Sequence, residues 1–246
     1  DIDSLNAQLQ DWTDIKSVAV GAGSVIGLKN DGTVVGCMID DSGIEDCGQT
    51  DVDDWSGVVA IAAGDYNTVG LLEDGTVIST KITGEQQYYY DFGQTNVDSW
   101  EDIKEISASE YNVVGLKKDG TVISTEITGF NCDYGQTDVS DWKNIESISA
   151  SDYHTVGLKK DGTVVSTEIN NNTSDDGQTE VGNWTNIVAV ATGAYHTVGL
   201  KRDGTVVSTK FTTDVDDWEK CCVVAADDRD IIAMTKKDHM LITTIE

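Results

Sequence analysis

Short runs in which apolar residues alternate with small or polar ones recur along the whole chain. One such set is the run at 187–191 (Ile-Val-Ala-Val-Ala), followed by Val198-Gly199-Leu200 and, beyond Asp203-Gly204, by 205–209 (Thr-Val-Val-Ser-Thr). Alternation with a period of two predicts half-buried strands, and an Asp-Gly between two such runs is a strong hairpin signal. We therefore expect three antiparallel strands in this stretch.

The same pattern repeats six times. Tryptophan occurs only at Trp12, Trp55, Trp100, Trp142, Trp184 and Trp218. An aspartate stands nineteen residues after each tryptophan, at Asp31, Asp74, Asp119, Asp161, Asp203 and Asp238. Glycine follows this aspartate in five units, whereas the sixth unit has His239. A fixed spacing over units of roughly forty residues indicates a repeat architecture, in which each unit is one supersecondary element.

Two further positions recur within the units. The strand before the Asp-Gly carries a glycine at Gly27, Gly70, Gly115, Gly157 and Gly199, and the sixth unit has Ala233. Glycine inside a strand indicates a close approach of backbones, so we expect a narrow central channel. Between units, a Gly-Gln-Thr-x-Val segment begins at Gly48, Gly93, Gly135 and Gly177, and we expect it to form a short outer strand.

Evenly spaced short strands without a long helical pattern favour radial repetition, which leaves only short sheet edges. The sequence thus predicts an all-β fold: a single closed β-propeller of six blades, each with three to four short antiparallel strands. Residues 1–246 would form one domain, with units beginning near the six tryptophans. The N-terminal segment that leads into Trp12 is expected to complete the last blade.

Residues 193–206 (Gly-Ala-Tyr-His-Thr-Val-Gly-Leu-Lys-Arg-Asp-Gly-Thr-Val), with a related copy at 152–158, resemble the repeat of the regulator of chromosome condensation family, especially its bacterial members. The resemblance implies a propeller, usually of seven blades, in a superfamily that includes a chromatin nucleotide exchange factor and a secreted bacterial β-lactamase inhibitor. This chain has six copies and no basic tail, so exchange activity is not carried over. A location outside a bacterial cell, or on its surface, is implied by the resemblance.

Charge narrows the classes of partner. The formal net charge is −28, from 44 acidic and 16 basic residues, and this repels polyanions, so nucleic acid is excluded as a partner. The charge favours a basic protein or cations as partners, or it serves solubility in a salty or extracellular setting. No stretch is apolar enough for a membrane span, and we expect a soluble monomer.

Several kinds of chemistry are not indicated. The cysteines Cys37, Cys47, Cys132, Cys221 and Cys222 are odd in number and match no zinc spacing, so neither a disulfide scaffold nor a bound metal is expected. His154 and His196 have Ser24, Asn67, Asn112 and Asp230 as counterparts in other units, which favours a structural hydrogen-bonding role. Known catalytic motifs are absent. We expect no enzyme activity, no catalytic residues and no cofactor.

The units differ most in the segments 81–92, 126–134, 168–176 and 210–214, which the repeat places on one rim. Aromatic residues are concentrated there, and tyrosine and phenylalanine are favoured at interfaces because their rings bury much area at little rotamer cost. The sequence therefore predicts a non-enzymatic protein-binding propeller. The predicted partner-binding residues are Tyr88, Tyr89, Tyr90, Phe92, Phe130, Tyr134 and Phe211. The alternatives are a carbohydrate-binding propeller, a glycan-active hydrolase, or rings that only pack within the chain.

Overall fold

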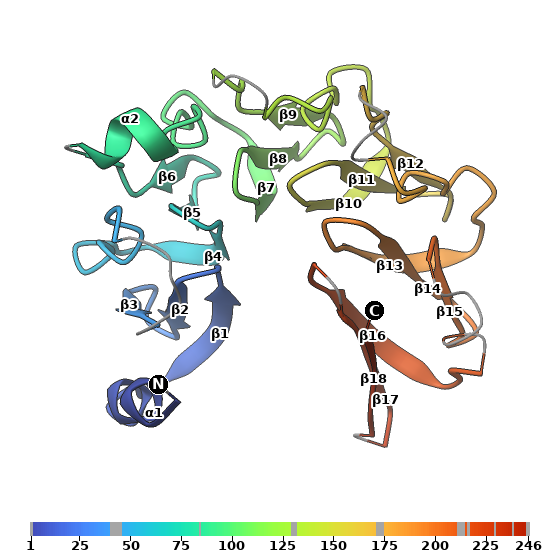
Figure 1. Ribbon diagram of the computed structural model, residues 1–246, viewed down its shortest axis with the longest axis horizontal. Helices are drawn as coiled ribbons and strands as arrows, with labels where there is room; N and C mark the ends of the chain where they lie inside the picture. The colour runs from blue at the N-terminus through green and yellow to red at the C-terminus, as the bar shows by residue number, and fades with distance from the viewer. Residues whose placement is uncertain are drawn as a thin grey trace. The chain divides into compact units, whose positions relative to one another are not determined.

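The fold was determined as a computed structural model, which describes residues 2–39, 46–83, 85–128, 132–170, 175–210, 215, 217–228, 230–237 and 239–244. Six sheets of three strands each are present, and neighbouring strands are antiparallel (Figure 1). Within each sheet, the order of the strands in space is the same as their order along the chain. The prediction of an all-β propeller with six blades of antiparallel strands is confirmed for the strands and sheets.

The strands of the first three sheets are β1 (Ile15–Val20), β2 (Ser24–Lys29), β3 (Val34–Met38), β4 (Val58–Ala63), β5 (Thr68–Leu72), β6 (Val77–Ser79), β7 (Ile103–Ala108), β8 (Val113–Lys117) and β9 (Val122–Ser124). The strands of the last three sheets are β10 (Ile145–Ala150), β11 (Thr155–Lys159), β12 (Val164–Ser166), β13 (Ile187–Thr192), β14 (Thr197–Lys201), β15 (Val206–Ser208), β16 (Cys221–Ala226), β17 (Asp230–Thr235) and β18 (Met240–Thr244). Two short helices are α1 (Ile2–Leu9) and α2 (Gln86–Tyr90).

The chain divides into two compact units. The first comprises Asp1–Lys118 and Thr125–Phe130, and the second comprises Asp119–Ser124 and Asn131–Glu246. Each unit is described by itself below. Closure of the blades into a ring and the single domain over residues 1–246 stay predictions.

The N-terminal segment does not add a strand to the last blade, as the sequence had led us to expect. It forms helix α1, which contacts β3, and the last sheet takes its three strands from β16, β17 and β18. Leu5 and Leu9 are four residues apart and both half-buried, so they lie on one helical face. Leu5, Ala7 and Leu9 also alternate with polar residues, as in a strand, but Ala7 is exposed, so the helical spacing of the two leucines determines the buried face.

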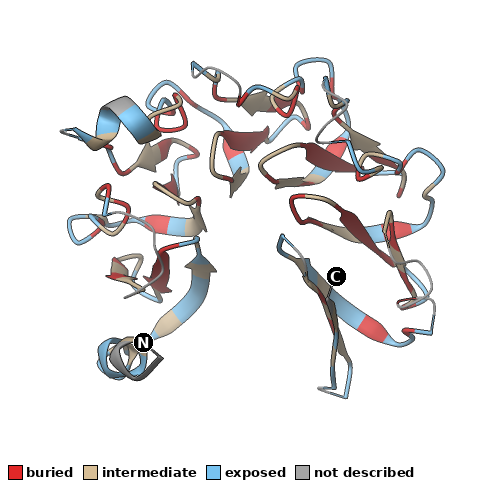
Figure 2. Cartoon of the chain, in the orientation of Figure 1, coloured by how far each residue is buried: buried red, intermediate tan, exposed pale blue. Residues whose placement is uncertain are grey.

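The middle strand of each sheet lies between its two neighbours and is the most buried (Figure 2). Its recurrent glycine is explained by the tryptophan of the same unit, and the expectation of close backbones around a channel was wrong for this position. A Cβ at Gly70 would lie 2.9 Å from the ring of Trp55, and one at Gly157 would lie 2.8 Å from the ring of Trp142. Each glycine therefore makes room for an indole ring that covers the sheet.

The Asp-Gly segments form the predicted hairpin turns. Gly75 has φ +92°, a conformation that only glycine adopts without strain. In the same turn the Asp74 carboxylate accepts hydrogen bonds from the backbone N–H (2.9 Å) and the hydroxyl (2.7 Å) of Thr76, which lowers its pKa. The Gly75 carbonyl oxygen accepts the N–H of Ile103, at the start of the next sheet, over 2.9 Å. The turn thus connects two successive sheets.

Successive sheets stack through apolar residues. In the first unit, Ile26 and Leu28 of the first sheet pack against Val58 of the second, and all three are buried. In the second unit, Val198 and Ile231 belong to the core between the fifth and sixth sheets.

The end sheets each leave one apolar face exposed. On the last sheet, Val224, Ala233 and Leu241 face the fifth sheet, whereas Val223, Met240 and Ile242 are 51%, 60% and 57% exposed. On the first sheet, Val18 and Val20 are 56% and 64% exposed, although Ile61 and Ala63, their counterparts in the second sheet, pack against a neighbouring sheet.

The residue that precedes each inner strand adopts a left-handed conformation. The six positions are Asp14, Gly57, Asp102, Asn144, Asn186 and Lys220, with φ between 58° and 69°. Glycine, asparagine and aspartate tolerate this conformation, whereas other L-residues are destabilised in it by about 1–2 kcal/mol. Lys220 is the exception in this set.

We predict that Lys220→Gly stabilises the protein by about 1 kcal/mol, because it removes this backbone strain. The measurement is the free energy of unfolding from urea denaturation. Lys160→Gly makes the same charge change at an exposed residue outside the left-handed set and should destabilise. Equal effects of the two variants would contradict the prediction.

Candidate functional site

The Gly-Gln-Thr segments form turns and not the expected outer strand, and a buried glutamine in each organises the loop that precedes it. Gln49, Gln94, Gln136 and Gln178 are fully buried. In each segment the glutamine Oε1 accepts the backbone N–H of the residue two positions earlier, over 2.6–2.7 Å. A buried side chain that carries both donors and acceptors requires such partners, so the side chain fixes the end of the loop.

The glutamines make further hydrogen bonds within their loops and, at Gln136 and Gln178, to the following sheet, whereas the third unit has Val113 in place of the bonding threonine. The Gln94 amide nitrogen donates to the carbonyl oxygen of Tyr90 over 2.6 Å. The main-chain oxygen of Gln136 accepts the hydroxyl of Thr155, the first residue of β11, over 2.7 Å, and Thr197 bonds Gln178 in the same way over 2.8 Å. The rim loops are therefore anchored to the sheets by repeated internal hydrogen bonds.

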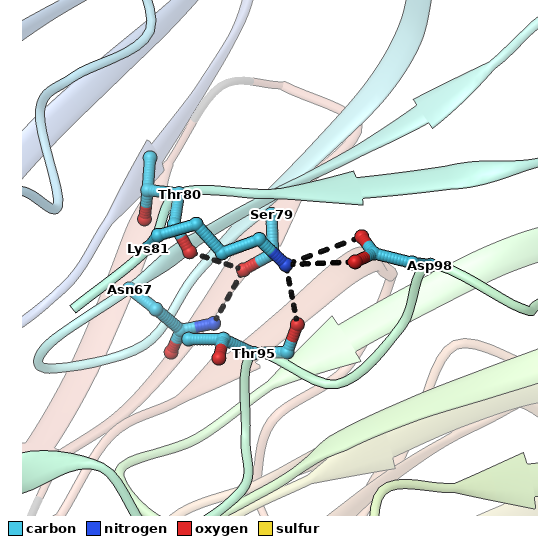
Figure 3. A network of polar contacts seen from close by, with 6 residues as sticks. All are labelled: Asn67, Ser79, Thr80, Lys81, Thr95 and Asp98. Carbon is cyan, nitrogen blue, oxygen red and sulfur yellow. Dashed lines mark hydrogen bonds and ion pairs between the residues drawn. The ribbon is translucent and has the colours of Figure 1, made fainter. Parts of the chain in front are cut away.

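The loop at residues 81–92 is also closed at its base (Figure 3). The Lys81 ammonium lies 3.1 Å from Asp98 and donates to the carbonyl oxygen of Thr95 over 3.3 Å, next to the Asn67 amide, which donates to Ser79 Oγ over 3.5 Å. The Lys81 and Asp98 side chains are exposed, and such pairs contribute about 0.2–1 kcal/mol. The buried hydrogen bonds of Gln94, each worth about 1 kcal/mol, provide at least as much of the anchoring.

This loop carries α2 and the three consecutive tyrosines. Tyr88 lies in α2, and its side chain is outside the described part of the structure. The Tyr89 side chain is 65% exposed. The ring of Tyr90 stacks on that of Tyr66, with centroids 4.4 Å apart and an interplanar angle of 27°, and lies 6.3 Å from the ring of Tyr89. We call Tyr66, Tyr89 and Tyr90 the α2 cluster.

Two other predicted residues, Phe92 and Tyr134, are half-buried and make ring contacts within the chain. Phe92 meets the edge of Tyr111 with centroids 5.1 Å apart. In the second unit, Tyr134 meets Tyr153 over 4.8 Å, and Tyr153 meets Tyr195 over 5.2 Å. We call Tyr134, Tyr153 and Tyr195 the tyrosine row. Phe130 and Phe211, the remaining predicted residues, lie outside the described residues.

The structure thus adds Tyr66, Tyr111, Tyr153 and Tyr195 to the rim. Each follows an inner strand by three residues, in the turn that leads into the middle strand. The recurrence of tyrosine just before Asn67, Asn112, His154 and His196 was a signal in the sequence, but repeated positions were assigned to scaffolding. The rings of these turns contact rings of the adjacent rim loops, as Tyr66 does with Tyr90 and Tyr153 does with Tyr134.

The electrostatic environment of these rings is negative. Burial, followed by the nearby carboxylates of Glu110 and Asp65, raises the pKa of Tyr66 to about 12. The pKa of Tyr153 is also raised, first by the hydrogen bond that its hydroxyl shares with that of Tyr195 (3.4 Å) and then by burial. These hydroxyl groups stay protonated at physiological pH and act as neutral hydrogen-bonding groups.

His154 has the predicted structural role. The hydroxyl of Thr197 donates its single proton to Gln178, so Thr197 Oγ1 accepts the proton of His154 Nε2 over 2.7 Å. His154 Nδ1 lies 3.0 Å from the hydroxyl of Ser151. The ring is fully buried, and burial followed by the nearby His196 lowers its pKa to about 3. It is therefore a neutral connector between the fourth and fifth sheets.

His196 occupies the same position in the next unit without these partners. Gly193 replaces Ser151, and Ile231 replaces Thr197, so neither ring nitrogen of the buried His196 has a hydrogen-bond partner among the residues that the structure describes. The predicted hydrogen-bonding role is therefore not found for this residue. Burial lowers the pKa of His196, and the carboxylate of Asp227 acts in the opposite direction.

Other chemistry is sparse in the described part of the chain. No group of three or more histidine, cysteine, aspartate or glutamate residues there could hold a metal ion. Of the cysteines, Cys222 is exposed and the other four are buried. No helix among the described residues has the length and apolar character needed to cross a bilayer. The rim aromatics are the best candidate for a functional surface.

Comparisons with known proteins identify the fold. No family model matches the chain, and no curated protein matches it in sequence. The CRINKLY WD40 ectodomain of the Arabidopsis thaliana receptor kinase ACR4 superposes with a TM-score of 0.67 at 17% identity, over 94% of this chain and 85% of that chain.

Yeast RCC1 (Prp20), solved with Kap60 bound to it, gives a TM-score of 0.64 at 17% identity, over 96% of this chain and 71% of that chain. Prp20p from Saccharomyces cerevisiae, solved in a study of its binding to Gsp1p and histones, gives 0.62 at 15% identity, over 91% and 70%. The chain therefore resembles RCC1-like β-propellers, as the sequence predicted. At these identities the likeness concerns the fold.

We predict that His154→Asn, which introduces the residue found in the second and third units, flattens the decline of stability between pH 7.5 and pH 5. The folded pKa of His154 lies below its unfolded value of about 6.5, so the unfolded chain binds the proton first. The stabilisation is complete above pH 6.5 and is lost as the pH falls. The wild type should lose about 2 kcal/mol more than the variant over this range.

The measurement is urea denaturation of both proteins at the two pH values. The carboxylates titrate alike in both proteins, so the difference between their profiles reports on the histidine. Parallel profiles would contradict the buried neutral state of His154.

Proposed function

We propose that the chain is a non-enzymatic protein-binding propeller whose partner contacts the rim that carries the tyrosines. The observation that carries this proposal is the exposed ring of Tyr89 on a loop held at both ends. Gln94 anchors the loop on one side, and Lys81 closes its base on the other. An aromatic side chain on a preorganised loop supplies contact area without a large ordering cost, as binding hot spots do.

The structurally similar proteins support the general class of protein-binding propellers. Prp20p was studied for its binding to Gsp1p and histones, and RCC1 (Prp20) was solved with Kap60. Because a fold hosts many functions, this support is an analogy. The specific argument is the arrangement of the rim, where rings of the variable loops lie beside the tyrosines that recur in the turns, as Tyr90 does on Tyr66.

Carbohydrate binding and glycan hydrolysis are less well supported. A sugar-binding platform needs several open ring faces, whereas among the described rings of the α2 cluster Tyr89 is the exposed one and Tyr66 and Tyr90 stack on one another with centroids 4.4 Å apart. A hydrolase needs a distinctive pair of carboxylic acids, and the described residues do not single one out by a raised pKa of an Asp or Glu. An extracellular location remains part of the proposal.

We predict that Tyr89→Ser weakens partner binding by about thirtyfold or more, the effect of losing roughly 2 kcal/mol at a hot spot. A photo-crosslinking amino acid at position 89 should attach to a partner protein in extracts of the producing cells and their medium. The same amino acid at Glu73 is the control, since this exposed residue follows β5 at the end remote from Tyr66.

The urea denaturation midpoint of Tyr89→Ser should match that of the wild type, because the side chain is exposed. Equal crosslinking at positions 73 and 89, or full binding by a folded Tyr89→Ser protein, would refute the proposal. Binding to a glycan array that depends on Tyr89, without any crosslinked protein, would favour the carbohydrate alternative.

A further inference from the structure

The second unit contains a lysine held by the rim itself. The Lys210 ammonium lies 5.8 Å from the ring centroid of Tyr195 and 3.0 Å from a carboxylate oxygen of Asp176. The side chain of Lys210 is 24% exposed, and that of Asp176 is 50% exposed. Tyr195 is the last ring of the tyrosine row, so the Lys210 ammonium group lies at one end of this row of three rings.

Two attractions act on this lysine. The face of an aromatic ring attracts a cation placed within about 6 Å of its centroid, and a carboxylate forms a charge-assisted hydrogen bond with an ammonium group. Tyr195 comes from the turn before β14, whereas Asp176 comes from the loop that precedes Gly177. The turn tyrosine and the preceding loop therefore form a small cation-binding corner, which the chain fills with its own side chain.

The α2 cluster also contains a turn tyrosine in the first unit. Tyr66 stands in the turn before β5, at the position equivalent to Tyr195, and Tyr90 of the rim loop that follows β6 stacks on it. Burial, followed by the carboxylates of Glu110 and Asp65, raises the pKa of the Tyr66 hydroxyl, so the stacked pair lies in a negative environment. Tyr89 extends the cluster outward and is the exposed ring.

We propose that the α2 cluster binds arginine or lysine side chains from a basic segment of the partner protein, in the way that Tyr195 and Asp176 hold Lys210. This inference rests on the proposed function and adds the chemistry of the partner. The net charge of −28 attracts such a segment over a long range and raises its association rate at low ionic strength. The rings and nearby carboxylates then select the cationic groups.

The first test uses defined probes. A short peptide of arginine, glycine and serine is compared by calorimetry with peptides in which lysine, citrulline or glutamate replaces arginine. Citrulline keeps the shape of arginine and removes its charge. Arginine and lysine peptides should bind, citrulline should weaken binding by about tenfold or more, and the affinity should fall as salt is added. Tyr89→Phe should retain binding, and Tyr89→Ser should lose it.

The second test removes the internal cation. Lys210→Met should open the corner at Tyr195 and Asp176, so that an additional arginine peptide binds per chain. Lys118→Met is the matched control, because Lys118 carries the same charge and lies 3.7 Å from Asp102, at the far end of β8 from Tyr111. A purely long-range attraction to a negative protein would make the two variants bind alike.

The outcomes separate this inference from the proposed function. Equal binding of arginine and citrulline peptides, or no change in stoichiometry with Lys210→Met, overturns the inference. If the crosslinked partner still depends on Tyr89 and its binding is insensitive to salt, the protein-binding function stands and its cationic chemistry is wrong. If arginine peptides bind through Tyr89 but no protein is crosslinked there, the cation site stands without the proposed function.

Discussion

The packing of one sheet on the next is the interaction on which the rest of the structure depends. A three-stranded sheet cannot bury its own faces, and each repeat therefore needs its neighbours for stability. Within the first unit, Ile26 and Leu28 are buried only because the second sheet covers them. The carbonyl oxygen of Gly75 adds a hydrogen bond from the turn of one sheet to the first strand of the next. Together these contacts set the spacing at which the rim loops are presented.

The residues that anchor the rim loops differ from the residues that vary within those loops. Gln94 and Gln136 are fully buried and hold the ends of their loops through main-chain groups. Because these bonds involve main-chain atoms, they place no demand on the side chains of the loop itself. The loops are free to differ in aromatic content, and one of them carries Tyr89 as an exposed ring.

The sequence predicted the strands and turns well because their signals are local. Period-two alternation and Asp-Gly turns depend on neighbouring residues, and six copies reinforce each other. The buried glutamines were missed because a polar residue between two turns carries no sign of its burial. The reason for Gly157 was also missed, since the contact with Trp142 joins residues fifteen positions apart (142 to 157). Helix α1 was missed because the N-terminal segment was expected to form a strand of the last blade, although it lies outside the repeated pattern.

The candidate site was predicted in part. Tyr89 is exposed as expected, whereas Phe92 and Tyr134 lie with their rings against Tyr111 and Tyr153. Composition alone cannot distinguish an aromatic residue that covers a neighbour from one that faces solvent. Tyr66 and Tyr195 were overlooked because their positions repeat, and repetition was equated with scaffolding. Tyr195 contacts Lys210 and Tyr66 contacts Tyr90, so the repeated tyrosine position also carries rings that touch the variable segments.

The buried glutamine at the end of each rim loop has a consequence for how such a chain can be altered. A foreign peptide grafted between Lys81 and Asp91 would inherit fixed end points, since the closing hydrogen bonds belong to Lys81, Asp91, Gln94 and the main chain. The insert could vary in length and composition while the sheets beneath it stay unchanged. Four loops of this kind on one repeat array would make a scaffold for engineered recognition, comparable in logic to the hypervariable loops of an antibody.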